Sequence, residues 1–473
     1  MILVLVIDVL VISTLVWVAL TRGLERALPF AAFVLVLVPR QSNIAVPGLP
    51  DVTTARLTVL SLALLYVVFG RAQSTTRSAG RPALAILILA DLAWLATSTA
   101  DSVVPLVSFK ALLSQALDFF LVYYIFFKAA TDLNTIRRIL GGIVSAIGVC
   151  CILGYFEAYH QWTVMQYFPA ITDLAGSSSQ GLAVGLGRGL RIRSTFPHPI
   201  LFGAALAFAI PLTLYLIKTA QSRAGKIILW ASLMLMFMNI YKTASRGPWL
   251  ALIISMALLV IFSRSEVRKY IVWLAVLSAF VLIVRPGVWD TIKSDYDATL
   301  VPDSPEGESY QYRYELLHLA TRRIGGDLDR ALWGYGPESF FDLHLQGVNP
   351  DTGNSFTYVS CDSAVAELMI ETGYVGFVLV VLMLLKMAKI AFSGYRSLPP
   401  PYGELSLSFF IVIAAFCFMM TNVAIYGWGQ QSYFLWIVFA LSEVLPSCVP
   451  EEPPITSRAV TPQGELVAAA HAS

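Results

Sequence analysis

The chain has very few charged side chains, which excludes an ordinary water-soluble domain. Asp, Glu, Lys and Arg make up 13% of its 473 residues, and hydrophobic residues make up 57%. Soluble domains carry about 25% charged residues. There are only five cysteines, without metal-binding spacing, so we expect neither a bound metal nor a disulfide framework. The composition predicts a membrane protein, and we expect no cofactor and no nucleic-acid partner.

Apolar runs of about 16–24 residues recur along the whole chain. Runs of this length cross the ~30 Å hydrocarbon core as helices, because a lipid-exposed sheet edge would leave backbone groups without hydrogen bonds. We therefore predict an all-α polytopic fold with about 12–13 transmembrane helices, the second and third runs being short. The expected spans are 3–20, 26–39, 56–70, 83–99, 104–127, 136–158, 199–217, 226–242, 248–263, 268–284, 373–392, 406–425 and 430–446.

Positive charges mark alternate connections between these spans, and the positive-inside rule places those connections in the cytoplasm. They lie near residues 71–81, 128–138, 218–226, 264–269 and 386–396. The remaining connections then face outward, including the 160–197 loop, the turn at Arg246 and the long 285–372 loop. This long loop holds fifteen acidic against six basic residues. Charges gathered at a bilayer surface are costly, so we expect a functional site on the outer face.

Two short outer segments carry arginines beside helix starts. Arg191 and Arg193 precede the span 199–217, and Arg246 lies in the turn before the span 248–263. Guanidinium groups next to free helical N–H groups bind anions. Short outer turns usually carry few lysines and arginines, because positive charge favours the cytoplasmic side. A cation in so short an outer turn therefore favours a ligand-binding role. The alternative for both segments is contact with lipid headgroups.

The long loop contains three further features. Residues 310–326 have helical spacing and include Arg313. The Gly334-x-Gly336 pair is a poor phosphate signature, and it fits a simple bend as well. Asp362 comes just before the last apolar stretch of the loop. It is a candidate acid–base group, and the alternative is that it caps the following helix.

Taken in order, these segments resemble one family. They read Arg-x-Arg-x-Thr-Phe-x-His-Pro from Arg191, Thr-x-Ser-Arg-Gly-x-Trp from Thr243, Trp-Gly-x-Gly-Pro from Trp333, and Asp-Ser-x(7)-Glu-x-Gly from Asp362. Each motif is loose, and the ordered set around one large outer loop is more specific. The set resembles the O-antigen ligase and O-antigen polymerase superfamily of bacterial envelope glycosyltransferases.

The resemblance implies a metal-independent, inverting glycosyl transfer on the periplasmic face of the bacterial inner membrane. The donor would be a glycan on undecaprenyl diphosphate, and the acceptor a sugar hydroxyl on lipid A-core, on another lipid-linked repeat or on a protein. Membrane lipids and other polysaccharide-assembly proteins are further candidate partners.

The resemblance also assigns roles to residues. It places Arg191, Arg193, Arg246 and Arg313 at the diphosphate, although either Arg191 or Arg193 matches the family's upstream arginine. Arg246 and Asp362 are the expected catalytic residues. Ligases usually carry a His-Asn pair where this chain has Asp362-Ser363, which favours a polymerase or exopolysaccharide-type member.

The expected organisation is an N-terminal helix bundle (1–284), a periplasmic loop that forms part of the active site (285–372), C-terminal helices (373–446) and a disordered cytoplasmic tail (447–473). The competing functional class is a transporter or flippase component that binds lipid-linked or other anionic solutes without chemistry. The sequence lacks the paired, Gly/Pro-broken spans of an inverted-repeat transporter. A catalytically silent relative within an envelope complex is a third alternative.

Overall fold

The computed structural model describes residues 2–44, 50–70, 81–169, 181–185, 189–263, 293–294, 297, 305–348, 355–358, 360–427 and 429–450. Within these residues, seven helices are long and apolar enough to cross a membrane. Three more apolar helices are shorter, with 10–17 residues each. The chain is therefore an all-α polytopic membrane protein, which confirms the fold class predicted from composition.

The first part of the chain forms helices that continue into one another or turn tightly. Two of them contain π-helical segments: η1 (Tyr66–Gly70) extends α3, and η2 (Ala116–Leu121) joins α6 to α7. The bounds are α1 (Ile2–Arg22), α2 (Leu24–Leu37), α3 (Thr54–Leu65), α5 (Ala85–Ala100), α6 (Pro105–Gln115), α7 (Val122–Ala129) and α8 (Leu133–His160). The predicted span 104–127 is thus one apolar run from α6 to α7.

The second part contains the centre of the bundle and the helices of the long loop. The bounds are α9 (Pro199–Thr219), α10 (Arg223–Lys242), α11 (Arg246–Phe262), α14 (Pro305–Gly325), α15 (Leu328–Trp333), α16 (Ala364–Ser397), α17 (Tyr402–Met420) and α18 (Gly429–Val444). Short 3-10 turns, η3 (Val164–Tyr167) and η4 (Leu445–Cys448), follow α8 and α18. The helical spacing noted over residues 310–326 corresponds to α14.

The described strands form three small antiparallel hairpins in the connections between helices. They pair β1 (Asn43–Ile44) with β2 (Val52–Thr53), β3 (Ala183–Gly185) with β4 (Gly189–Arg191), and β5 (Gln346–Val348) with β6 (Ser355–Thr357). In the register of the second hairpin, Ala183 lies opposite Arg191. All three hairpins belong to connections that the charge pattern places outside.

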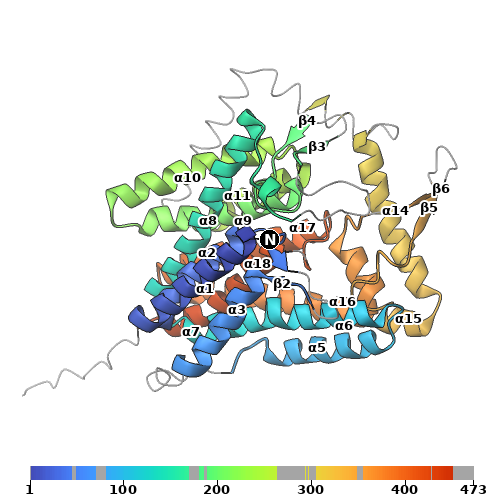
Figure 1. Ribbon diagram of the computed structural model, residues 1–473, viewed down its shortest axis with the longest axis horizontal. Helices are drawn as coiled ribbons and strands as arrows, with labels where there is room; N and C mark the ends of the chain where they lie inside the picture. Colours follow the sequence, from blue (N-terminus) through green and yellow to red (C-terminus); the bar gives the residue numbers. More distant parts are fainter. Residues whose placement is uncertain are drawn as a thin grey trace, which may run out of the picture.

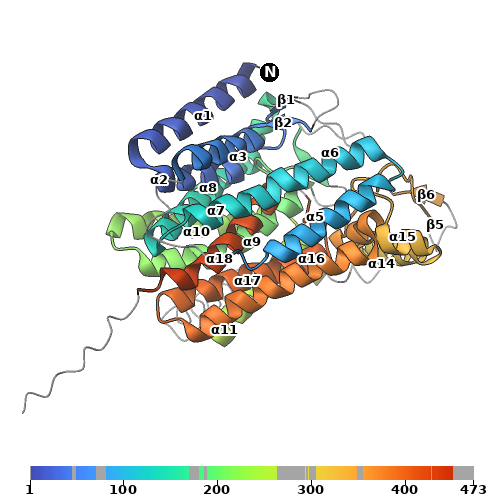
Figure 2. The ribbon, with the colours of Figure 1, turned by 90° about the horizontal axis from the view of Figure 1, so that it is seen from below.

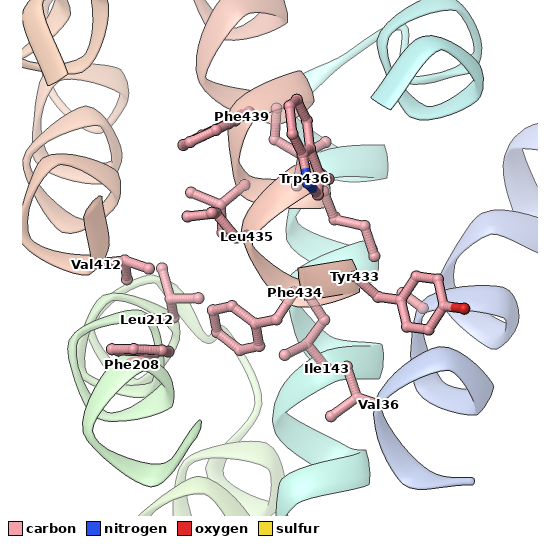
Figure 3. Close-up of a cluster of buried hydrophobic side chains, with 14 of the residues drawn as sticks. Val36, Ile143, Phe208, Leu212, Val412, Tyr433, Phe434, Leu435, Trp436 and Phe439 are labelled. Carbon is pink, nitrogen blue, oxygen red and sulfur yellow. The ribbon is translucent and has the colours of Figure 1, made fainter. Parts of the chain in front are cut away.

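The hydrophobic core surrounds α9 and α18. Of the apolar window in α9, 94% is buried, against 22% in α10, so α9 is central and α10 peripheral. Helix α18 is buried on nearly all sides because its apolar residues are not confined to one face. Figure 3 shows Phe434 and Leu435 of α18 packed toward Phe208, Leu212 and Val412.

The loop elements gather at one end of the helical bundle. Figures 1 and 2 show α14, α15, β5 and β6 together beside the first turns of α16 and the start of α6. Helix α16 contains a break at Gly373, whose backbone is not helical (φ 68°). The predicted membrane entry at residue 373 coincides with this break, and residues 364–372 add a helical segment before it.

Twelve of the thirteen predicted spans correspond to helices, and the span 268–284 lies outside the described residues. Several of these helices are shorter than a full crossing. Two ends differ by five residues: α16 continues to Ser397, beyond the predicted 392, and α17 stops at Met420, short of the predicted 425. The helix stops there because Thr421 Oγ1 and Asn422 Nδ2 both donate to the carbonyl oxygen of Phe418, at 2.8 and 3.2 Å. The predicted tail from 447 lies mostly outside the described residues.

Candidate functional site

Arg246 is the first residue of α11 and follows the three-residue turn 243–245. The turn is rigid, because Thr243 Oγ1 and Trp249 Nε1 both donate to the carbonyl oxygen of Ile240, at 2.7 and 2.9 Å. A cation is unfavourable at a helix N-terminus, where the dipole already presents positive charge. Arginine at this position therefore points to an anionic ligand that both the guanidinium and the free N–H groups of α11 attract.

Arg191 lies against the same turn. Its Nε donates to the carbonyl oxygen of Thr243 at 3.1 Å, and its Nη2 donates to Ser245 Oγ at 2.7 Å. Helix α9 comes close to α11 here, because a Cβ added at Gly203 would lie 2.7 Å from Cγ of Pro248. The structure thus brings the predicted residues Arg191 and Arg246 to one turn.

Arg193 is placed differently, within its own loop. The backbone N–H groups of Arg193 and Ser194 both donate to Oε2 of Glu157, at 2.8 Å each, and Thr163 Oγ1 donates to Oε1 at 2.7 Å. The guanidinium of Arg193 donates to the carbonyl oxygen of Pro197. Glu157 is only 2% exposed. This buried carboxylate fixes the segment that carries both upstream arginines.

Arg313 and Asp362 form an ion pair across the long loop. Nη2 of Arg313 lies 3.2 Å from Oδ2 of Asp362, and the side chains are 25% and 32% exposed. Ser360 Oγ donates to the other carboxylate oxygen at 3.0 Å, and the Tyr312 hydroxyl donates to the carbonyl oxygen of Ser360 at 2.7 Å. Helix α14 therefore holds the segment just before α16, and Asp362 stays partly open to solvent.

The alternative that Asp362 caps the next helix is wrong. Ser363 is the N-cap of α16, and its hydroxyl accepts a hydrogen bond from the N–H of Ala366. One carboxylate oxygen of Asp362 instead accepts from Arg313, and the other accepts from Ser360. Its position is thus set by a side chain 49 residues away.

Asn422 connects the two arginine-bearing regions. Its carbonyl oxygen accepts from Nε of Arg313 at 3.2 Å, and its side chain lies beside Gly247, where an added Cβ would be 3.5 Å from Cβ of Asn422. The next residue, Val423, accepts a hydrogen bond from the N–H of Ala364 at 3.2 Å. The turn after α17 therefore contacts the start of α11, the loop helix α14 and the start of α16.

The Gly-x-Gly turn of the loop is a packing element. Gly334 and Gly373 both have positive φ, at 72° and 68°. A Cβ on Gly334 would lie 2.5 Å from the carbonyl group of Glu371, and one on Gly373 would lie 2.1 Å from the carbonyl oxygen of Leu332. The N–H of Gly336 donates to the carbonyl oxygen of Glu371 at 2.9 Å. These contacts support the simple bend rather than a phosphate-binding loop.

The surroundings of Asp362 contain groups that stay protonated near neutral pH. Burial raises the pKa of Tyr358 to about 12 and also raises the pKa of Tyr312. Burial, with the charge of Glu367, raises the pKa of the Cys361 thiol well above its ordinary value. Among the described residues, no group of three or more His, Cys, Asp or Glu side chains is arranged to hold a metal ion.

Two residues of this region were not anticipated from the sequence. Glu157 is an isolated acid in the last turns of an apolar span, and that isolation was the available signal. Asn422 fell inside the predicted span 406–425, where a polar Thr421-Asn422 pair was the available sign of an earlier helix end.

Comparison with known proteins gives one family match. Residues 231–381 match the family described as O-Antigen ligase. The match includes Arg246, Arg313, Asp362 and the turn at Gly334, and it begins after Arg191 and Arg193. No curated protein matches the chain. The family match confirms the predicted resemblance to the O-antigen ligase and polymerase superfamily, and it supports glycan transfer of that general type.

Proposed function

We propose that this chain, which carries an O-antigen ligase match over residues 231–381, transfers a glycan from undecaprenyl diphosphate to a sugar hydroxyl on the periplasmic face. It would act as a polymerase or a ligase in O-antigen or exopolysaccharide assembly. One observation carries the proposal. Arg191 contacts the turn before Arg246, and Asn422 lies between the start of α11 and the ion pair of Arg313 with the partly exposed Asp362.

The charge pattern supports an outward-facing site in the inner membrane. Helix α9 begins at Pro199, beside the arginines of the site, and ends next to Lys218 at its other end. Helix α16 likewise starts beside Asp362 and ends near Arg396. Lysines and arginines that flank short connections favour the cytoplasmic side. The opposite end of the bundle, which holds the site, then faces the periplasm.

The arginines would stabilise the leaving group. Attack of an acceptor hydroxyl on the anomeric carbon forms a new C–O bond, breaks the bond to the diphosphate and inverts the anomeric configuration. Negative charge grows on the diphosphate as it leaves, and guanidinium groups stabilise it through charge-assisted hydrogen bonds. Arg246, with the N–H groups of α11, would contribute most, and Arg191 and Arg313 would bind the same group. The proposal needs no metal ion.

Asp362 would take the proton of the acceptor hydroxyl. Its ion pair with Arg313 couples donor binding to activation of the acceptor. A diphosphate that binds Arg313 competes with the carboxylate for the same guanidinium. Binding of the donor would then release a carboxylate oxygen for the acceptor. General-base catalysis of this kind contributes about 10²–10⁴-fold to the rate.

The test uses cells from which the gene for this protein has been deleted. Wild-type protein or Arg246→Ala is then expressed in these cells, and their lipid-linked glycans are analysed. Single undecaprenyl-diphosphate repeats that accumulate and are cleared only by wild type identify a polymerase. Finished polymer on the same lipid identifies a ligase. Arg246→Lys is the matched variant: it keeps the charge but loses bidentate binding, so we expect partial rescue. Full activity of Arg246→Ala, or no accumulation of either species, would overturn the proposal and favour the transporter class.

A further inference from the structure

A separate pocket lies near the end of α2, the starts of α3 and α18, and the C-terminal part of α6 with η2. Its volume is about 730 Å³ when the space open to solvent is included. Arg191, Arg193, Arg246 and Arg313 do not line it. Its polar lining includes Arg40, Gln115, Asp118, Glu338, Gln430 and Tyr433.

One wall of the pocket is a face of α6 and its π-helical continuation. Ala111, Gln115 and Asp118 recur at helical spacing along this face. Asp118 is held by Arg56 of α3, with Nε to Oδ1 at 3.2 Å and Nη2 to Oδ2 at 2.9 Å. Nη1 of Arg56 donates to the carbonyl oxygen of Asp51 at 2.7 Å. The charge of Arg56 is therefore largely neutralised by its partner.

A second wall presents a buried acceptor that no described protein group satisfies. Gln430 lies in the first turn of α18 and is 2% exposed. Its Nε2 donates to the carbonyl oxygen of Thr195 at 2.9 Å, whereas its Oε1 has no hydrogen-bond partner among the described residues. A buried acceptor without a partner is destabilising. Because Gln430 lines the pocket, a ligand hydroxyl that reaches this acceptor would satisfy it.

Tyr433 lies one turn further along α18. Figure 3 shows its ring directed away from Phe434, with the hydroxyl toward the N-terminal helices. It thus adds a phenol and an aromatic face to the wall that contains Gln430.

The long loop contributes an acid to the pocket in a strained conformation. Glu338 has a positive φ of 60°, which is rare for a residue with a side chain. The neighbouring carbonyl oxygen of Pro337 accepts a hydrogen bond from Ser108 Oγ on α6 at 2.7 Å, and this contact fixes the turn. Backbone strain of this kind persists where the surrounding structure holds it, and it clusters at ligand sites.

The charges of the pocket differ from those of the arginine site. Arg40 and Arg56 are balanced by Asp118 and Glu338, so the lining is formally neutral. A diphosphate would meet two carboxylates here, which is unfavourable. Guanidinium, amide, carboxylate and phenol groups together supply both donors and acceptors, which is what neutral hydroxyl groups require.

We propose that this pocket binds a sugar residue of the glycan, a role that rests on the proposed function and adds a sugar subsite to it. The 422–430 segment connects the two places. Asn422 contacts Gly247 and Arg313, and Gln430 lines the pocket eight residues later. A sugar in the pocket would belong either to the donor or to the acceptor.

The experiment measures equilibrium binding to full-length protein in lipid nanodiscs. The probes are undecaprenyl diphosphate and fluorescently labelled oligosaccharide, released by mild acid from the cell's own surface polysaccharide. Glu338→Gln and Gln430→Leu should weaken oligosaccharide binding about tenfold or more, because each removes a buried or charge-assisted hydrogen bond. Binding of undecaprenyl diphosphate should stay unchanged. Asp342→Asn is the matched control, an exposed acid of the same loop outside the pocket lining.

Unchanged oligosaccharide binding in both variants, or none in wild type, would overturn the sugar pocket. Loss of undecaprenyl diphosphate binding would instead assign the pocket to the diphosphate. If the oligosaccharide binds as expected while Arg246→Ala transfers glycan normally, the pocket stands and the proposed function fails. Competition by the intact lipid-linked donor, but not by undecaprenyl diphosphate, assigns the pocket to the donor sugar. If saturating lipid-linked donor leaves oligosaccharide binding unchanged, the pocket is assigned to the acceptor sugar.

Discussion

Replacing Asp362 with asparagine should nearly abolish glycan transfer and leave the fold almost unchanged. The stability effect is bounded by the geometry of the Arg313–Asp362 pair, which has a nearest contact of 3.2 Å and side chains 25% and 32% exposed. Pairs this open to solvent contribute about 0–1 kcal/mol. Asparagine also keeps an oxygen that can accept from Ser360. The chemical effect is larger, because loss of a general base costs about 10²–10⁴-fold in rate.

Two measurements on the same purified protein separate these effects. The unfolding midpoint in detergent should fall by at most about 2 °C, since less than about 1 kcal/mol is lost. Turnover of lipid-linked donor should fall by at least about 100-fold at saturating donor. Ser360→Ala is the matched control: it removes the second hydrogen bond of Asp362 but keeps the carboxylate, so turnover should fall much less.

Turnover near the wild-type rate in Asp362→Asn would refute the role of Asp362 as a base. A transporter without chemistry predicts a different outcome, which is no turnover of lipid-linked donor by wild type or by Asp362→Asn. A large drop in the unfolding midpoint, with turnover reduced only in proportion to folded protein, would show instead that Asp362 is structural.

The remaining predictions concern buried residues near the candidate site. Glu157→Gln should lower the free energy of unfolding by about 1–3 kcal/mol, because the N–H groups of Arg193 and Ser194 would then donate to a neutral amide oxygen instead of a charged carboxylate, and thermal unfolding will measure this. Equal stability of mutant and wild type would contradict it. Cys361 should react slowly with maleimide at pH 7–8, because burial raises the pKa of its thiol and leaves little thiolate. Tyr314→Cys, at a position 59% exposed, should label rapidly, and labelling of Cys361 at a similar rate would show that Cys361 is accessible.

The helices were largely predictable because insertion of an apolar run depends on its own length and composition. The predicted runs at 199–217 and 226–242 match α9 and α10 to within three residues. The end of α17 was predicted five residues too late. The mean hydropathy of the segment stays high across 421–425, although the polar pair Thr421-Asn422 ends the helix.

The candidate site was predictable as a set of residues but not as an arrangement. Arg191 and Arg193 cannot be distinguished by sequence alone, because they lie two positions apart in the same connection between helices. In the structure, Arg191 contacts the turn before Arg246, whereas the loop of Arg193 is fixed by Glu157. Local pattern contains no information about these contacts, because their partners lie 36–54 residues away.

The sequence by itself determined that the chain is an all-α membrane protein, where most helices lie, and which arginines and acids gather in the connections that its charge pattern predicts to face outward. Hydropathy and charge are summed along the chain, so these properties need no knowledge of folding partners. Only the tertiary structure decided that Asp362 pairs with Arg313 rather than capping α16, and that Asn422 joins two distant segments. It also placed Gln430 and Glu338 in a shared pocket. Such contacts depend on how the helices pack, and packing brings together residues that no local spacing relates.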